Sequence, residues 1–308
     1  MRYRLLGDTD IRVSEIGVGC GGLGGEKKMG LEPVVEHALD LGINFFDTCD
    51  TYAESRSEQT LGRVLGKRRR DEFVICTKFG GVIDAQGEWR RDISIPHLHR
   101  AFEASCRRLQ VEHLDVYLVH TPPQDLDREQ ALFAELDAMV KAGKIRAYGV
   151  STETGRFATA IGQASRAKAV ELAFNLFRQE PRAAFLDYAR AQGMGIVCKS
   201  PMANGVLTDS FDPDNPTDAR RYFRKFGAER FQRRAELVRQ VRPILRRDGR
   251  TMAQGALAWL LAFPEVSTVI PGIQSLARLE ETAAVTDMRL APDDLAELDA
   301  IGTLKDEI

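Results

Sequence analysis

The sequence has few cysteines, few aromatic residues, no long apolar run and almost no net charge. Its five cysteines are an odd number without a Cys-x-x-Cys pair, which argues against a disulfide framework and against a cysteine-bound zinc site. A net charge of −2 gives no electrostatic reason to expect nucleic acid or a membrane as a partner. No apolar segment reaches the length of a membrane span, and the N-terminus does not resemble a secretory signal. We therefore expect a cytoplasmic protein without a resident metal; its oligomeric state is left open.

Strand-like and helix-like segments alternate along most of the chain. After an N-terminal hairpin, the residue patterns predict strands near 15–19, 43–47, 73–78, 114–120, 145–150, 168–173, 194–198 and 267–271. Helices are expected near 30–41, 57–66, 95–109, 127–142, 154–165, 181–192, 234–262 and after 275. Eight strands with intervening helices predict an α/β fold in which a parallel sheet closes into a (β/α)8 barrel, the TIM barrel. No linker-like segment divides the pattern, so residues 1–308 are expected to form one domain.

The hairpin is expected to pair residues 3–6 with residues 11–13 through a turn that contains Gly7. Three other stretches show neither the helical nor the strand period, and long loops in a compact domain are commonly functional. They are residues 20–29, 79–93 and 199–232. On a barrel these loops would surround the mouth of a substrate pocket.

Four polar residues stand at or just after the ends of apolar runs. The runs, residues 42–47, 73–78 and 114–120, are rich in β-branched or aromatic residues, as buried strands are. They end in Asp47, Lys78 and His120, and Tyr52 follows the first run by a few residues. Each residue alone has an ordinary structural explanation, such as a turn cap or a solvated strand end. Because a barrel places its chemistry at the C-terminal strand ends, we expect the four to converge.

Convergence of these side chains predicts proton transfer to a carbonyl oxygen. A phenol with a pKa near ~10 is a poor acid at neutral pH, and the adjacent ammonium of Lys78 is expected to lower the pKa of Tyr52. Asp47 would keep Lys78 charged and in place, and His120 would orient the carbonyl group. No side chain supplies a hydride, so a nicotinamide or a flavin has to be the donor.

One local motif indicates a different fold. Residues 17–22 match the Gly-x-Gly-x-x-Gly fingerprint of dinucleotide-binding Rossmann sheets. The fingerprint requires a helix that opens at these glycines, but the glycine-rich residues 24–30 follow instead. The acidic residue at the right distance, Asp40, precedes the next strand rather than ending it. We therefore reject a Rossmann dehydrogenase and expect Gly21 and Gly22 to let the backbone approach a cofactor or substrate closely.

The order of the motifs resembles the aldo-keto reductase superfamily over nearly the whole chain. The matching segments are Asp47-Thr-Cys-Asp-Thr-Tyr52 with Ser57-Glu58 and Leu61-Gly62, Lys78, Asp115-Val-Tyr-Leu-Val-His120, Gly149-Val-Ser151, Phe174-Asn-Leu176, Ser200-Pro201 with Gly205 and Leu207, and Ile270-Pro-Gly272. The resemblance implies an NAD(P)(H)-dependent oxidoreductase that interconverts an aldehyde or ketone and an alcohol. It also implies that the four strand-end residues are the catalytic set. Potassium-channel β-subunits resemble the same family, so a nucleotide-sensing regulatory subunit is the alternative.

The resemblance further implies which residues bind the cofactor. They are Gly21, Gly22, Asp47, Ser151, Thr152, Glu171, Lys199, Ser200, Pro201, Gly205, Leu207, Gly272, Gln274, Arg278, Glu281 and Thr282. Three of them depart from the family pattern around the nicotinamide: Thr152 replaces an Asn, Glu171 a Gln, and Lys199 a stacking aromatic residue. Lys199 is expected to face a cofactor phosphate, because an ammonium does not stack as an aromatic ring does.

The matching segment at 271–282 leads into a predicted helix, and a helix N-terminus favours anions. In the family this segment binds the adenosine phosphate, with a basic residue at the position of Arg278. The closing Asn of the family motif is Thr282 here. We therefore expect NADPH to be preferred over NADH. The alternative is that Arg278 only pairs with Glu281 on the same helix face.

Overall fold

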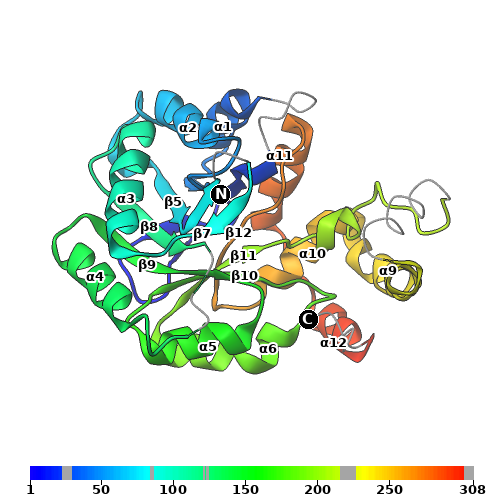
Figure 1. Ribbon diagram of the computed structural model, residues 1–308. Coiled ribbons are helices and arrows are strands. Elements are labelled where there is room, and N and C mark those ends of the chain that lie inside the picture. The colour runs from blue at the N-terminus through cyan, green and yellow to red at the C-terminus, as the bar shows by residue number, and fades with distance from the viewer. Residues whose placement is uncertain (23–29, 84–86, 121, 123–124, 216–226, 302–308) are drawn as a thin grey trace.

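The computed structural model describes residues 1–22, 30–83, 87–120, 122, 125–215 and 227–301, and Figure 1 shows its course. Eight parallel strands form one sheet: β3 (Val18–Gly19), β4 (Phe45–Asp47), β5 (Val74–Phe79), β8 (Leu114–Val119), β9 (Ile145–Thr152), β10 (Ala169–Ala173), β11 (Gly195–Lys199) and β12 (Val266–Val269). They are hydrogen-bonded in chain order, from β3 to β12. Parallel bridges from Ile16 to Val269 and from Gly19 to Gly272 join the first strand region to the last and close the sheet. The predicted (β/α)8 barrel is confirmed.

Helices surround the barrel (Figure 1). They are α1 (Leu31–Asp40), α2 (Arg56–Leu65), α3 (Ile95–Leu109), α4 (Gln130–Lys141), α5 (Gly155–Ala164), α6 (Glu180–Ala184), α7 (Leu186–Gln192), α9 (Ala228–Leu245), α10 (Met252–Leu261), α11 (Leu276–Ala283) and α12 (Pro292–Ile301). α9 packs against α10 and α12 at the outer edge of the molecule. Among the helices that the structure describes, none is both long and apolar enough to cross a membrane.

The structure corrects several expectations about local structure. The helix predicted over 181–192 is interrupted at Phe185 and forms α6 and α7. The single helix predicted over 234–262 is two helices, because Asp248 and Gly249 have positive φ and Thr251 starts α10 with a capping box to Gln254. The stretch 79–93 contains an antiparallel pair, β6 (Gly81–Ile83) and β7 (Trp89–Arg91), instead of an irregular loop. Of the stretch 199–232, residues 216–226 lie outside the described residues.

The predicted N-terminal hairpin is confirmed as β1 (Tyr3–Leu5) and β2 (Arg12–Ser14). Its apolar residues Leu6, Ile11 and Val13 are buried in a cluster with inward-facing residues of the barrel strands. This cluster fills the N-terminal end of the barrel with apolar side chains. The hairpin therefore leaves only the opposite end for polar chemistry.

Strand periodicity explains why polar groups gather at that opposite end. Side chains two residues apart on a strand point to the same face. Five residues of the inner apolar cluster are each followed, two positions along the chain, by a polar residue. The pairs are Phe45 and Asp47, Cys76 and Lys78, Leu118 and His120, Ala169 and Glu171, and Val197 and Lys199. The sequence thus changes from apolar to charged along the inward face of five strands.

One buried carboxylate serves the fold rather than the chemistry. Asp115 on β8 is fully buried and accepts hydrogen bonds from the backbone N–H of Ile75 at 2.8 Å, from Arg70 at 2.6 Å and from Arg146 at 2.8 Å. We expect Asp115→Ala to lower the free energy of unfolding by about 2–3 kcal/mol. This is less than the ~3–5 kcal/mol lost when one partner of a fully buried ion pair is removed, because both arginines keep some contact with solvent. Denaturant unfolding measures this loss.

The control is Asp10→Ala, which removes a carboxylate that is largely exposed and lies 3.1 Å from the same Arg146. It should leave the unfolding midpoint nearly unchanged. Equal midpoints for Asp115→Ala and the unmodified protein would show that Asp115 does not hold β5 and β8 together.

Candidate active site

The ammonium group of Lys78 is the centre of the polar cluster. Lys78 Nζ lies 2.5 Å from Asp47 Oδ1 and 2.9 Å from Glu171 Oε2, and it donates to the carbonyl oxygen of Thr48 at 2.9 Å. All three charged side chains are buried. Burial alone would lower the pKa of Lys78, but the charges of Asp47 and Glu171 outweigh burial and raise it well above its ordinary value. Lys78 therefore stays charged.

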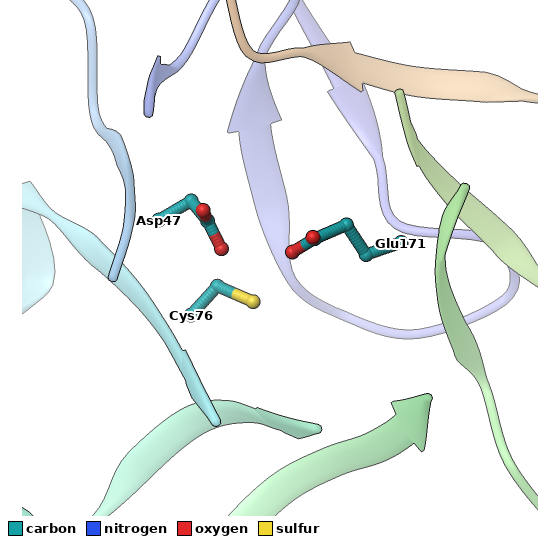
Figure 2. A group of neighbouring side chains, drawn as sticks. All are labelled: Asp47, Cys76 and Glu171. Atoms are coloured by element: carbon teal, nitrogen blue, oxygen red, sulfur yellow. The ribbon is translucent and has the colours of Figure 1, made fainter. Parts of the chain in front are cut away.

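Two carboxylates share this one ammonium. Figure 2 shows Asp47 and Glu171 pointing toward one another across the barrel interior. Burial, and then the charge of Glu171, raise the pKa of Asp47 to about 8. Burial also opposes ionisation of Glu171, but Lys78 and Lys199 outweigh it and lower the pKa of Glu171 to about 2. Of the two groups, Glu171 is the one that remains ionised over the wider pH range.

Asp47 and Glu171 also form a cluster with Cys76 in which the ligand atoms lie within 4.8 Å of one another (Figure 2). Burial raises the pKa of the Cys76 thiol well above its ordinary value, so the sulfur keeps its proton. The Lys78 ammonium already supplies positive charge to both carboxylates. We therefore assign this cluster to the ion pairs of Lys78.

Tyr52 and His120 stand beside the ion pairs, as predicted. Lys78 Nζ lies 5.1 Å from the centroid of the Tyr52 ring, and the rings of Tyr52 and His120 meet edge to face with centroids 6.0 Å apart. The sequence predicts a lowered phenol pKa, and this was wrong. Burial is the largest effect and raises the pKa of Tyr52 above its ordinary value, although Lys78 acts in the predicted direction. The phenol is therefore protonated at neutral pH and available as a donor.

His120 is neutral at the same pH. Burial, followed by the charge of Lys78, lowers the pKa of His120 to about 4. Its Nδ1 lies 3.2 Å from the sulfur of Cys49, and burial raises the pKa of that thiol, so it keeps its proton. When the Cys49 thiol donates its proton to Nδ1, the ring of His120 carries its own proton on Nε2. It can then donate that proton in a hydrogen bond to a carbonyl oxygen. Nothing in the sequence pattern predicts the contact with Cys49.

A strained turn positions Tyr52. The next three residues, Ala53, Glu54 and Ser55, all have φ between +52° and +66°, a conformation that non-glycine residues rarely adopt. The hydroxyl of Ser55 donates to the backbone carbonyl of Asp50 at 2.7 Å and closes the turn. Strain of this kind persists only where the surrounding structure requires it, and such places are commonly functional sites.

The predicted glycines lie next to this turn. Gly21 and Gly22 belong to the short 3-10 helix η1 (Cys20–Gly22) that follows β3. A side-chain carbon added to Gly21 would lie 3.0 Å from the ring of Tyr52, so the glycine provides room for that ring. Glycine at position 21 thus leaves room for the ring of the candidate acid, and cofactor contact stays a prediction.

A second polar group adjoins the first. Ser151 Oγ donates to Glu171 Oε1 at 2.9 Å, and Lys199 Nζ donates to Ser151 Oγ at 3.0 Å. Lys199 Nζ also lies 2.9 Å from Glu153, which the sequence interpretation missed although it comes one residue after the end of β9. The structure thus brings Ser151, Glu171 and Lys199 together, with Thr152 buried at the same strand end. Contact of Lys199 with a phosphate stays a prediction.

The predicted residues after β11 form a compact turn. Ser200 has φ +53° and Gly205 has φ +89°, while Pro201 and Leu207 are buried. The side-chain amide of Asn175 donates to the carbonyl oxygen of Ser200 at 2.9 Å and ties the turn to the end of β10. These residues shape the mouth of the barrel beside Lys199.

The segment after β12 offers an open approach to a helix N-terminus. A side-chain carbon added to Gly272 would meet no atom within 4 Å, so there is free space in front of this backbone. Gln274 is exposed, and Ser275 caps α11 by accepting from the backbone N–H of Arg278 at 3.1 Å. A glycine without neighbours before a helix start is suited to an anion that approaches backbone N–H groups closely.

Arg278 makes the ion pair that the alternative interpretation predicts. Its guanidinium pairs with Glu281, and both side chains are about one-fifth exposed. Glu281 also accepts from the hydroxyl of Thr251 at 2.6 Å, so it is held in place. Thr282 is buried, and its hydroxyl donates to the carbonyl oxygen of Leu279 within α11. A phosphate near Arg278 would therefore share the guanidinium with Glu281.

Known proteins resemble this chain over almost its full length. The sequence model of the Aldo/keto reductase family matches residues 15–303. The chain is 30% identical over 293 residues to the uncharacterized oxidoreductase YqkF of Bacillus subtilis (strain 168), covering 94% of this chain and 92% of that protein. It is 31% identical over 298 residues to the NADP(+) aldo-keto reductase yakc of Schizosaccharomyces pombe (strain 972), covering 93% and 87%.

Solved structures show the same fold. The holo form of aldo-keto reductase AKR11C1 from Bacillus halodurans matches with a TM-score of 0.82 and 25% identity, over 98% of this chain and 96% of that one. Glycerol dehydrogenase AKR11B4 from Gluconobacter oxydans matches with a TM-score of 0.80 and 22% identity, over 97% and 94%. The second likeness concerns the fold alone.

Proposed function

The chain belongs to the aldo/keto reductase family of oxidoreductases, and we propose that it interconverts an aldehyde or ketone and an alcohol with NADP(H). The observation that supports this most directly is the arrangement around Lys78. Its ammonium is bound by Asp47 and faces the ring of Tyr52, while neutral His120 meets that ring at its edge. A proton donor, a cation and a neutral hydrogen-bond donor are therefore side by side.

Each side chain has a distinct task in carbonyl reduction. The bound cofactor supplies the hydride that adds to the carbonyl carbon. Tyr52 donates its hydroxyl proton to the carbonyl oxygen, and the Lys78 ammonium stabilises the phenolate that remains. His120 donates a hydrogen bond from Nε2 to the same oxygen and so orients it. In alcohol oxidation the phenolate of Tyr52 accepts the proton.

Two groups of residues are suited to the ends of a nicotinamide dinucleotide. Ser151 and Glu171 offer a hydroxyl and a carboxylate, which match the acceptor and the donor of a carboxamide, and the adjacent ammonium of Lys199 suits a cofactor phosphate. At the other end, the open space at Gly272 and the guanidinium of Arg278 suit phosphate. The relative named as an NADP(+) aldo-keto reductase supports the same cofactor.

The test of the function is a panel of aldehydes and ketones assayed with NADPH and with NADH, followed by loss of the cofactor absorbance. We expect turnover of at least one carbonyl compound. A protein that binds both cofactors but reduces none of the panel would favour the nucleotide-sensing regulatory role.

Cofactor preference gives a separate prediction. The extra phosphate of NADPH carries nearly two negative charges, and a guanidinium–phosphate contact is worth ~1.5–3 kcal/mol. Arg278→Ala is therefore expected to weaken NADPH binding roughly tenfold to a hundredfold and NADH binding only slightly. Titration calorimetry with each cofactor measures both effects. Equal losses for the two cofactors would show that Arg278 does not contact the extra phosphate.

A further inference from the structure

The barrel interior holds one carboxylate more than Lys78 can neutralise. Asp47 and Glu171 are both buried, and both lie within 3 Å of the single Lys78 ammonium. Taking an uncompensated charge out of water is costly, so a second buried carboxylate requires a second cation or a proton. Below its pKa of about 8 Asp47 carries that proton; when both carboxylates are ionised, the second cation has to come from an element next to β10, which carries Glu171.

Lys199 on β11 fits this requirement. β11 is the hydrogen-bonded neighbour of β10, and Lys199 is paired in register with Ala173, two residues beyond Glu171 on the same face. Its ammonium lies 3.9 Å from Glu171 Oε1 and reaches the same oxygen through the hydroxyl of Ser151. On its other side it lies 2.9 Å from Glu153, whose side chain is mostly exposed. Solvent screens Glu153, so the buried charge that Lys199 offsets is that of Glu171.

We propose that Glu171 and Lys199 are a compensating pair of positioning residues for the catalytic cluster. Glu171 is the second counter-ion that fixes Lys78, and Lys199 offsets the negative charge that Glu171 brings close to Tyr52 and His120. The catalytic roles of Tyr52 and His120 in this inference rest on the proposed function. The charge pair itself does not.

Glu171 and Lys199 shift the pKa of the neighbouring His120 in opposite directions. The charged and titratable groups that influence His120 are Lys78 from β5, Glu171 from β10 and Lys199 from β11, and the thiol of Cys49 contacts its ring. Burial and Lys78 lower the pKa of His120, Glu171 raises it and Lys199 lowers it. For Tyr52, the carboxylates of Asp47 and Glu171 oppose the effect of Lys78.

The experiment compares the full chain with Glu171→Gln, Lys199→Met and the double variant, without any turnover. The pKa of His120 is followed by NMR, with its resonance identified by its loss in His120→Gln. We expect Glu171→Gln to lower this pKa and Lys199→Met to raise it, each by about half a unit or more. The double variant should return close to the original value.

Thermal unfolding of the same four proteins is the second measurement. Lys199→Met leaves Glu171 without its compensating cation and should lower the melting temperature, and adding Glu171→Gln should recover part of that loss. Glu265→Gln is the matched control, because Glu265 is a buried carboxylate that accepts from Arg190 at 2.6 Å just before β12, at the opposite end of the barrel. It should leave the pKa of His120 unchanged.

Shifts of the His120 pKa in the same direction for both single variants would overturn the proposal, as would additive losses of melting temperature in the double variant. Both measurements are made on the resting protein. If the carbonyl panel shows no turnover, the proposed reaction fails while the charge pair stays open to these two tests.

Discussion

Replacing Tyr52 with phenylalanine is expected to lower the rate of carbonyl reduction by ~10²–10⁴-fold while the cofactor still binds. The substitution keeps the ring that packs against Gly21 and meets His120 edge to face, and it removes only the hydroxyl. The proton would then have to come from water, because His120, with a pKa of about 4, is neutral at that pH and has no imidazolium proton to give. Single-turnover measurements with the best substrate of the panel isolate the hydride-transfer step from product release.

The matched control is Tyr117→Phe. Tyr117 is fully buried and stacks on Phe79 outside the barrel interior, and its hydroxyl has no hydrogen-bond partner in the described part of the chain. The same chemical change there should leave the rate of hydride transfer near its original value. If Tyr52→Phe behaves like this control, Tyr52 is not the general acid.

The fold was predictable because its signals are local. β-branched and aromatic runs of strand length, separated by helical patterns, specify a parallel sheet, and eight of them allow closure. Strand ends were predictable for the same reason, and with them the convergence of Asp47, Lys78 and His120. The break between α9 and α10 also had a local signal, since Gly249 and the cap Thr251 with Gln254 stand at the boundary.

The contacts across the barrel were not predictable in this way. Glu171 and Lys78 come from strands that are not neighbours in the sheet, so no strand pattern shows that their charged groups lie 2.9 Å apart. The sign of the pKa shift of Tyr52 was wrong for a related reason. Burial, which depends on the packing of the whole site, has a larger effect there than the adjacent ammonium.

Lys78→Met is expected to move the proton equilibrium of the site. The charge of Lys78 lies 5.1 Å from the centre of the Tyr52 ring, and at an effective dielectric constant of ~20 such a charge stabilises a phenolate by ~3 kcal/mol, or about 2 pKa units. Removing it raises the pKa of Tyr52 further. The limb of the pH profile for alcohol oxidation that reports this base should therefore move upward by about 2 units.

The same substitution should also change how stability depends on pH. Without the ammonium, burial raises the pKa of Glu171 above its unfolded value near ~4, as it already raises that of Asp47, so both buried carboxylates favour the protonated form. A folded state that binds more protons than the unfolded state loses stability as the pH rises. We expect the melting temperature of Lys78→Met to fall, relative to the unmodified protein, from about pH 4 toward neutrality.

Lys144→Met removes an exposed lysine just before β9 and serves as the control for the loss of a positive charge. It should alter neither the pH profile nor the pH dependence of the melting temperature. The two measurements on Lys78→Met separate its two roles, because the oxidation limb reports Tyr52 and the melting temperature reports the carboxylates. If the limb of the alcohol-oxidation pH profile does not move, another group sets the acidity of Tyr52. This holds even if the melting temperature changes with pH as expected for the carboxylates.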